Sequence, residues 1–350
     1  MVIVYGAYGH TGRFVVAELR ERGYVAVLSG RDADKLKALA ASTDGAEARP
    51  APVDDPAALD RALAGAAAVI NCAGPFATTA APLVEAALRA GIPYVDVAGE
   101  VEATADTFTY FADRAHAAGA VVVPAMAFYG GLGDLLVTAA LGDWERADEV
   151  HIAYALDSWH PTPGTRAASA VSRARRGGRR LRFAHGQLEY RDDSAPMVDW
   201  LFPDPVGART VIGEFLTADA VTTPTHLAVS DLSAYMTVDA VKEVLAPDSP
   251  APAAVDERGR SAQTFLVDVV VRSGGRERRA VARGQDIYAV SAPLAVEAVH
   301  RILTGRARTL GVAAAGALFD APDFLRALSS HLSFELGELG EPGELTELSE

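Results

Sequence analysis

The sequence predicts an α/β protein in which a doubly wound parallel sheet precedes a second, mostly antiparallel domain. Two observations support this prediction. Short apolar runs alternate with helix-like stretches over residues 1–140, and the runs are continuous enough for strands that are covered on both faces. From about residue 148 onward, strand-like stretches follow one another with few helices between them, which is typical of an antiparallel sheet.

Each element of the first part has its own local signal. The predicted strands are Val2–Tyr5, Val25–Gly30, Ala48–Asp54, Ala67–Gly74, Pro93–Gly99 and Ala120–Met126. The predicted helices between them include Arg13–Arg22, Ala33–Ala41, Pro56–Leu63 and Ala103–Ala118, and another ends at Ala90. Asp32 and Asp55 stand where N-caps are expected. Glycines follow most of the helices, where left-handed C-terminal residues are favoured.

The first turn, "GAYGHTG" from Gly6 to Gly12, carries three glycines between a strand and a helix. In a doubly wound sheet this turn binds a pyrophosphate on the free N–H groups of the helix N-terminus. Gly6 would permit the tight turn, Gly9 the approach of the phosphates and Gly12 the close packing of the helix. We therefore expect a dinucleotide site that includes Tyr8, His10 and Thr11, the alternative being a purely structural turn.

The end of the second strand indicates which dinucleotide is bound. A site for NAD usually has an acidic residue there, which accepts a hydrogen bond from the ribose 2′-hydroxyl. This strand ends in "LSGRD", where Arg31 offers a planar fork of donors for a phosphate and Ser29 adds a hydroxyl. Asp32 comes later and is expected to cap the next helix. The sequence therefore favours NADP(H), with Lys35 either reinforcing the phosphate site or solvated.

The fourth strand ends where the chain should pass the nicotinamide. Small residues at Ala73, Gly74 and Pro75 leave room for the ring, and backbone groups near Asn71 could bind its ribose and carboxamide. The Phe76 side chain would pack against the nicotinamide ring, or else fill the core. A plain strand-end turn is the alternative for the whole segment.

The fifth strand is followed by polar groups at the edge of the sheet where ligands collect. Asp96 lies between Val95 and Val97, so burial would oblige its carboxylate to find a partner. Asp96 is a candidate for substrate binding or proton transfer, or else a cap or buried anchor. Gly99 and Glu100 lie beside it.

Hydride transfer needs one proton handled by the protein. No tyrosine has a lysine four residues later, which excludes the Tyr-x-x-x-Lys arrangement of short-chain dehydrogenases. Tyr129, Asp157, His160 and Arg166 remain candidates at the domain junction. We expect the loop from Asp157 to Arg166 to face the nicotinamide, with Arg166 binding an anionic or carbonyl group and His160 or Tyr129 supplying the proton. If none of these side chains lies near the nicotinamide, the groups that take part in the reaction are expected at Asp96, Glu100 or the backbone of residues 125–131.

The second part is predicted to form strands with a few helices. The predicted strands are "EVHIAYALD", "RLRFAHGQLEY", "TPTHLAVSDL", "FLVDVVVR" and "RERRAVAR", the last two joined by "SGG" as a hairpin. The predicted helices are Arg166–Arg176, Val238–Leu245 and Pro293–Leu303. Residues 246–262 form a surface loop rich in Pro and Ala, and the acidic tail 336–350 is predicted to be disordered.

Several motifs together resemble one oxidoreductase family. "GAYGHTG", "SGRDADKL", "VINCAGPF" and "YVDVAGE", with "AMAFYGGLGDLL" after the sixth strand, are similar to the saccharopine dehydrogenase/reductase-like NAD(P)-binding family, which includes trans-acting enoyl reductases. "GQDIYAVSAPLAVEAV" resembles the family's return helix. The resemblance implies NADP(H), a Rossmann domain, an inserted α+β substrate domain (possible site of homodimer contact) and C-terminal helices that return to the first domain. The corresponding boundaries are 1–140, 141–284 and 285–335.

Composition limits the partners. The net charge of −14 argues against nucleic acid or anionic membranes, and no apolar run reaches the ~18 residues of a span. An exception is Arg173–Arg182, with six arginines in ten residues, which is a solvated helix end, an anion site or a nucleic-acid contact. A single cysteine, Cys72, predicted as core filler, fits a reducing compartment such as the cytoplasm. No metal-ligand cluster and no signal peptide is expected.

The sequence thus predicts an NADPH-dependent reductase of a small molecule with an imine or an activated alkene. Dehydrogenation of an amino acid-type secondary amine is an alternative. A non-catalytic NADP(H)-sensing protein is another, and the sequence does not name the substrate.

Overall fold

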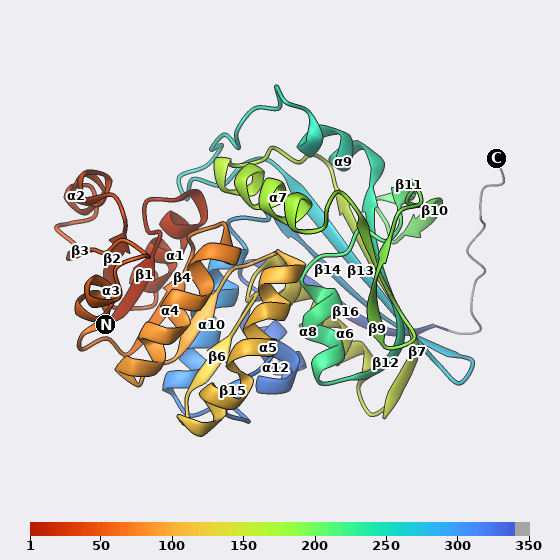
Figure 1. Ribbon diagram of the computed structural model, residues 1–350. Helices are drawn as coiled ribbons and strands as arrows, with labels where there is room; N and C mark the ends of the chain where they lie inside the picture. The colour runs from red at the N-terminus through yellow and green to blue at the C-terminus, as the bar shows by residue number, and fades with distance from the viewer. Residues whose placement is uncertain (340–350) are drawn as a thin grey trace.

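The computed structural model describes residues 1–339 as two sheets with helices around and between them. In Figure 1 the N-terminal sheet lies on the left and the second sheet on the right, and α7 (Pro163–Arg175) lies above the space between them. The predicted α/β architecture with a parallel sheet and a second, mostly antiparallel sheet is confirmed.

The first sheet is parallel and has the doubly wound order. Within residues 1–339 seven strands follow the order β15-β6-β5-β4-β1-β2-β3. These strands are β1 (Val2–Tyr5), β2 (Ala26–Gly30), β3 (Ala48–Pro50), β4 (Ala68–Asn71), β5 (Tyr94–Asp96), β6 (Val121–Val123) and β15 (Gly311–Val312). The sequence indicated the first six. Strand β15 was not predicted, because it comes from the C-terminal part of the chain and pairs with β6.

Helices cover both faces of this sheet. They are α1 (His10–Glu21), α2 (Ala33–Ala41), α3 (Pro56–Leu63), α4 (Phe76–Ala90), α5 (Val101–Ala117) and α10 (Ser291–Leu303). One apolar core joins α1, α2 and α10 to one face, and a second joins α3, α4 and α5 to the other. The predicted caps are confirmed, since Asp32 accepts from the N–H of Lys35 and Asp55 from that of Ala58, both at 3.0 Å.

The second sheet is antiparallel except for the pair of β7 with β12. Its strands are β7 (Arg146–Leu156), β8 (Arg180–Ala184), β9 (Gln187–Arg191), β10 (Met197–Phe202), β11 (Gly207–Ile212), β12 (Ala228–Thr237), β13 (Thr264–Ser273), β14 (Arg276–Gln285) and β16 (Leu332–Leu339). The predicted hairpin at "SGG" is confirmed. The stretch predicted as one strand over "RLRFAHGQLEY" is instead the hairpin β8–β9, which turns at His185 and Gly186 with positive φ at both.

Short helices lie in the connections between strands. They are η1 (Phe128–Leu132), α6 (Gly133–Leu141), α8 (Asp219–Thr222), η2 (Thr223–Thr225), α9 (Val238–Leu245), α11 (Ala315–Leu318) and α12 (Ala321–Ala327). The largest core contains residues of α6, of both sheets and of the C-terminal helices, so the two parts of the chain share one interior. Among residues 1–339, no helix combines the length and apolarity required to cross a membrane.

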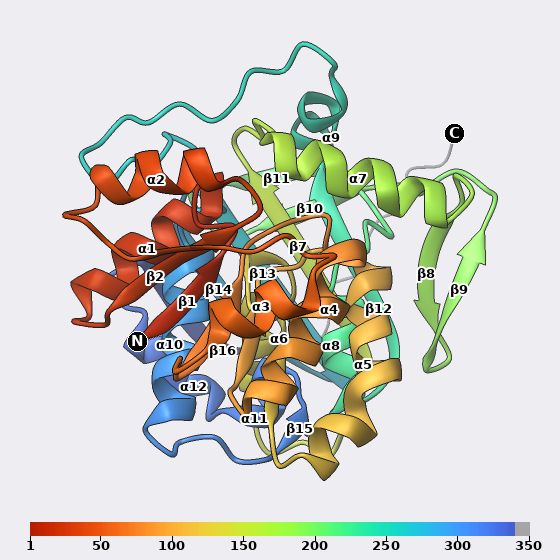
Figure 2. The same ribbon diagram turned by 60° about the vertical axis from the view of Figure 1, so that its left-hand side comes forward.

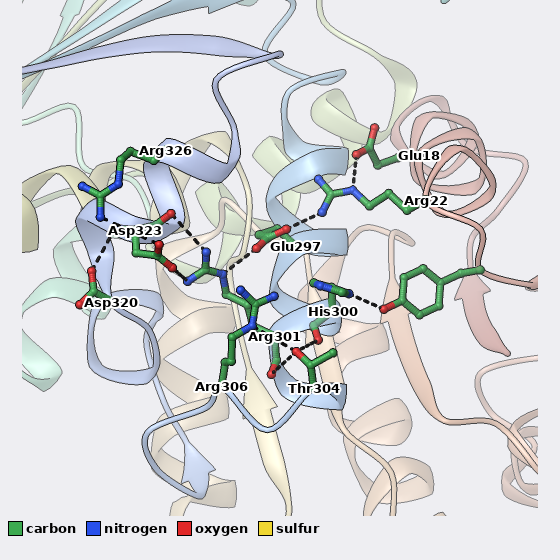
Figure 3. Close-up of polar contacts among 11 residues, drawn as sticks. Glu18, Arg22, Glu297, His300, Arg301, Thr304, Arg306, Asp320, Asp323 and Arg326 are labelled. Carbon is green, nitrogen blue, oxygen red and sulfur yellow. Dashed lines mark hydrogen bonds and ion pairs between the residues drawn. The ribbon is translucent and has the colours of Figure 1, made fainter.

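Polar contacts hold the C-terminal helices against the first domain (Figure 3). The carboxylate of Glu297 on α10 accepts a hydrogen bond from Arg22, the residue after α1. It accepts another, at 2.6 Å, from Arg301 of its own helix. Tyr24 and His300 are hydrogen-bonded at 2.6 Å, from the Tyr hydroxyl to Nδ1. Helix α10 therefore packs back on α1, as the resemblance implied.

The predicted boundary at residue 336 falls inside a strand. Strand β16 pairs with β14 along its whole length, and Glu335 forms an ion pair of 2.9 Å with Arg283. The first residues of the predicted disordered tail are therefore ordered in the second sheet. Residues 340–350 lie outside the described residues.

Candidate functional site

A cavity of about 1650 Å³ runs from the first turn of the parallel sheet to the second sheet. The turn after β1, the end of β2 and the turn after β4 line one part of it. Helix α7, the segment after β11 and helix α9 line the other part. Figure 2 shows α7 and α9 above the carboxyl ends of the parallel strands, where doubly wound sheets bind their ligands.

The glycine turn is shaped for a close ligand. Gly6 has a φ of +82°, and a β-carbon there would lie 2.9 Å from Ala73. A β-carbon on Gly12 would lie 2.2 Å from the carbonyl oxygen of Gly6, so Gly12 is required for packing and does not line the cavity. Gly9 precedes α1, and no side chain caps this helix. The first N–H groups of a helix lack intrahelical acceptors, so an anion can bind there.

Three further residues of this turn line the cavity, namely Tyr8, His10 and Thr11. The His10 ring packs edge-on against Phe14 and Tyr288, with ring centroids 5.3 and 5.2 Å apart. Burial lowers the pKa of His10, which favours the neutral ring. Its Nε2 is buried and has no hydrogen-bond partner among residues 1–339, which makes it available to a ligand.

The end of β2 offers positive charge. Arg31 is exposed, lines the cavity and has no acidic partner among residues 1–339. Lys35 lies over the Tyr8 ring, 5.6 Å from its centroid, and pairs with Asp32 at 3.3 Å. The prediction for Ser29 is wrong, because this side chain is fully buried and donates to the carbonyl of Arg49 on β3 at 2.8 Å.

The turn after β4 forms the next part of the wall. Ala73, Gly74, Pro75 and Phe76 all line the cavity. Cys72 lines it too, so it does more than fill the core.

The side chain of Asn71 is fully buried and does not line the cavity, so the predicted cofactor contact at this position stays a prediction for the backbone near it. Its amide donates to Tyr94 at 3.1 Å and accepts from the Ala73 N–H at 3.0 Å. This contact fixes the turn from within.

Glu100 caps the helix that starts at this turn. Its carboxylate accepts from the N–H groups of Phe76 at 3.0 Å and Ala77 at 3.1 Å, at the N-terminus of α4. Burial raises the pKa of Glu100, while these hydrogen bonds act against the rise. Glu100 also lines the cavity, so one carboxylate holds the nicotinamide-side wall in place.

Asp96 is a buried anchor and does not reach the cavity. Its carboxylate accepts from the N–H groups of Ala98 at 3.0 Å and Ala125 at 2.7 Å, and from the Tyr94 hydroxyl at 2.9 Å. Burial raises the pKa of Asp96 to about 6. The catalytic role considered for Asp96 is therefore corrected to the structural alternative, because its oxygens are occupied by its own sheet edge.

Tyr129 meets the cavity between the two domains. Its ring packs near Trp159 and Tyr154, with centroids 5.6 and 5.2 Å away. Its hydroxyl is buried and has no hydrogen-bond partner within residues 1–339, and Tyr129 lines the cavity. Burial raises the pKa of Tyr129 well above its ordinary value, so the hydroxyl keeps its proton.

The loop after β7 faces the cavity with only some of its residues. Trp159 and residues 161–166 line it, but His160 does not. The Nε2 atom of His160 lies 3.1 Å from the carboxylate of Glu243 on α9, so His160 is not placed as a proton donor.

Arg166 lines the cavity, yet its guanidinium donates to the carbonyls of Ala246 at 3.2 Å and Ser249 at 2.9 Å, which corrects its assignment as a free substrate anchor. The carboxylate of Asp157 accepts a hydrogen bond from the N–H of Thr264.

The prediction missed a buried carboxylate beside Tyr129. Asp219 accepts from the Gly130 N–H at 3.0 Å and from the Tyr154 hydroxyl at 2.7 Å, and Thr217 donates to it as well. Burial raises the pKa of Asp219 to about 6. The only sequence signal was one acidic residue in the otherwise apolar and threonine-rich stretch "FLTADAVTT".

The residues fit a phosphorylated dinucleotide. The uncapped helix start and the glycine turn would hold the pyrophosphate, and Arg31 offers a cation at the position of the ribose 2′-group. The turn after β4 and Tyr129 would then lie at the nicotinamide end.

Comparisons with known proteins agree with this geometry. The sequence model of the saccharopine dehydrogenase NADP binding domain matches residues 2–123. A probable mitochondrial saccharopine dehydrogenase-like oxidoreductase of Arabidopsis thaliana is 30% identical over 147 residues, which are 36% of this chain and 31% of that protein. A trans-acting enoyl reductase of Mycobacterium bovis is 28% identical over 134 residues, 36% of this chain and 32% of that protein.

A solved structure extends the likeness to the whole fold. Apo histidine-tagged saccharopine dehydrogenase (L-Glu forming) from Saccharomyces cerevisiae has a TM-score of 0.65 and 14% identity, and it covers 96% of this chain and 99% of that one. At this identity the likeness concerns the fold alone. The curated relatives match over only about a third of their own length. Residues 2–123 therefore match the NADP binding domain of the saccharopine dehydrogenase family, and the likeness of the rest of the chain concerns the fold alone.

Proposed function

We propose that the protein is an NADPH-dependent reductase of a small molecule that carries a C=N or an activated C=C bond. One observation carries the proposal. The anion-binding turn and Tyr129 line the same cavity, and the buried Tyr129 hydroxyl has no hydrogen-bond partner among residues 1–339. An anion site alone would suit any nucleotide-binding protein, but a buried proton donor at the opposite end suits reduction.

When bound, NADPH supplies a hydride, that is, one proton and two electrons, to one atom of the double bond. The helix start at Gly9 and Arg31 would hold its phosphates, and the wall from Ala73 to Phe76 would position the nicotinamide end, since all of these line the cavity. The O–H of Tyr129 donates a proton to the other atom of the double bond and regains it from solvent through the open cavity. Because burial keeps Tyr129 protonated, this donor is available at neutral pH.

The names of the relatives support an oxidoreductase. One curated relative is named as an enoyl reductase, and others as saccharopine dehydrogenase-like oxidoreductases. Oxidation of a secondary amine is the reverse of imine reduction at the same site, and there Tyr129 would accept the proton that it otherwise donates.

Consumption of NADPH with panels of cyclic imines and enoyl thioesters tests the proposal. We expect turnover with at least one panel, and Tyr129→Phe should lower kcat by about 10²- to 10⁴-fold with cofactor affinity unchanged. Tyr110→Phe is the matched control, since Tyr110 is 65% exposed and outside the cavity. Tight NADPH binding without turnover on any compound would instead favour an NADP(H)-sensing protein.

A further inference from the structure

Helix α7 lies over the cavity, beside α4 and α5, and residues along its whole length line the cavity. None of its thirteen residues, all within the described part of the chain, is buried. At its N-terminal end Arg166 donates to the carbonyls of Ala246 and Ser249, and at its C-terminal end Arg175 pairs with Asp106 of α5 at 2.8 Å. The helix is therefore fixed at both ends, while its middle borders open space.

The arginine-rich stretch at the end of α7 divides into two groups. Four of its arginines form ion pairs with carboxylates. These pairs are Arg175 with Asp106, Arg176 with Glu102, Arg180 with Asp193 and Glu214, and Arg182 with Glu214. The other two, Arg173 and Arg179, meet no carboxylate among residues 1–339, and both line the cavity. Arg179 lies over the Tyr190 ring, 4.3 Å from its centroid, and donates to the carbonyl of Arg176.

Below α7 the cavity wall is apolar. Ile212 lines it from the end of β11, and Phe215 and Leu216 line it from the segment that follows. Val241 and Val244 line it from α9. Positive charge at the mouth and apolar side chains further in are complementary to a ligand with an anionic end and an apolar body.

The size of the cavity leaves room for such a ligand beside the cofactor. Ligand pockets usually enclose about 300–1,000 Å³, whereas this cavity encloses about 1650 Å³. The wall from Gly6 to Lys35 is taken up by the cofactor, so the space beneath α7 remains for a second molecule.

We propose that the space beneath α7 is a binding site for an acyl chain with an anionic end group, a carboxylate or a phosphate. Arg173 and Arg179 bind the anion, because guanidinium groups match the geometry of both oxyanions. The chain lies on Phe215, Leu216 and Val244 and points toward Tyr129. This inference rests on the proposed function, since it places the substrate of that reaction.

Binding of cis-parinaric acid, an anionic polyene chain that fluoresces in apolar surroundings, tests the site without turnover. With the NADP⁺-loaded full chain we expect saturable binding about tenfold tighter than that of the methyl ester. Replacing both arginines, Arg173→Ala with Arg179→Ala, should remove this preference. Arg175→Ala is the matched control, because Arg175 lies on the same helix but pairs outside the cavity.

The apolar part is tested separately. Val244→Asp should weaken the acid and the ester alike, by about tenfold or more. Competition with octanoate and with octanoyl-coenzyme A then identifies the anion as carboxylate or phosphate, and displacement by either supports the site. Equal affinity for acid and ester, an equal loss in Arg175→Ala, or no displacement by either competitor would overturn it. Because parinarate binding consumes no NADPH, a lack of turnover with intact binding would contradict only the proposed reaction.

Discussion

Asp219 of the second domain accepts a hydrogen bond of 3.0 Å from the backbone N–H of Gly130, the residue after Tyr129. Gly130 has a φ of +101°, and a β-carbon there would lie 2.6 Å from the Ala125 carbonyl oxygen. The backbone that carries Tyr129 is thus held in a conformation suited to glycine by a carboxylate from the other domain. We infer that Asp219 is a positioning residue for Tyr129.

Asp219→Ala should reduce the rate of NADPH oxidation by at least about tenfold and leave the affinity for NADPH unchanged, because Asp219 is fully buried and does not line the cavity. It should also destabilise the fold by about 1–3 kcal/mol for each buried donor left unpaired. Tyr154→Phe, which removes one of these donors, is the control and should cost less stability. An unchanged rate in folded Asp219→Ala would show that the contact does not position Tyr129.

Arg31→Ala should weaken NADPH binding by about 10- to 100-fold and hardly change NADH binding. The reason is that a charge-assisted hydrogen bond to the 2′-phosphate contributes about 1.5–3 kcal/mol. Titration calorimetry with both cofactors measures the effect. Lys35→Ala should have a smaller effect, since Lys35 is paired with Asp32. A similar loss for NADPH and NADH would contradict the role of Arg31.

Gly9→Val should abolish cofactor binding while the protein still folds. Gly9 has a φ of −68°, which other residues adopt, and its β-carbon would lie 3.1 Å from the Gly6 carbonyl oxygen, a tight contact that a small shift relieves. Gly9 lines the cavity at the start of α1, so a branched side chain there would take space that we expect the pyrophosphate to occupy. Gly12→Ala should behave differently and lower the free energy of unfolding, because its β-carbon would clash with the Gly6 carbonyl. Fluorescence titration and urea unfolding separate the two effects. Full NADPH affinity in Gly9→Val would mean that the turn has only a structural role.

Local signals in the sequence were sufficient for the first domain. The caps at Asp32 and Asp55, the glycine turn and the strand–helix alternation are all set by neighbouring residues. The same holds for α9, whose bounds Val238–Leu245 agree with the prediction. The glycine turn in its parallel-sheet context could therefore be placed from the sequence alone.

Contacts between distant residues were not visible in the sequence. Residues 336–339 of β16 were predicted to be disordered because the tail is acidic, but their backbone pairs with residues 277–280 of β14. Similarly, His160 was expected to face the cavity, but its ring lies against the carboxylate of Glu243, which is far away in the chain. Ser29 is bound by a carbonyl of the neighbouring strand β3. In each case the partner lies too far along the chain for periodicity or spacing to reveal it.

Asp96 should make the stability of the protein depend on pH near 6. Burial raises its folded-state pKa to about 6, above the value of about 3.9 for a free aspartate. Between these values the folded state binds more protons than the unfolded state, so the contribution of Asp96 to the free energy of unfolding increases as the pH falls from about 7 to about 5. It is lost again as the pH rises through about 6.

Comparison with Asp96→Asn isolates this contribution, because asparagine does not titrate. Histidines with lowered pKa values, namely His10, His300 and His331, act in the opposite direction in both proteins and cancel in the difference. Urea unfolding at about pH 5, 6 and 7 should show that wild type gains stability relative to Asp96→Asn as the pH falls. A difference that stays constant over this range would show that the Asp96 carboxylate is no harder to ionise in the fold than in water, and that its three hydrogen bonds offset its burial.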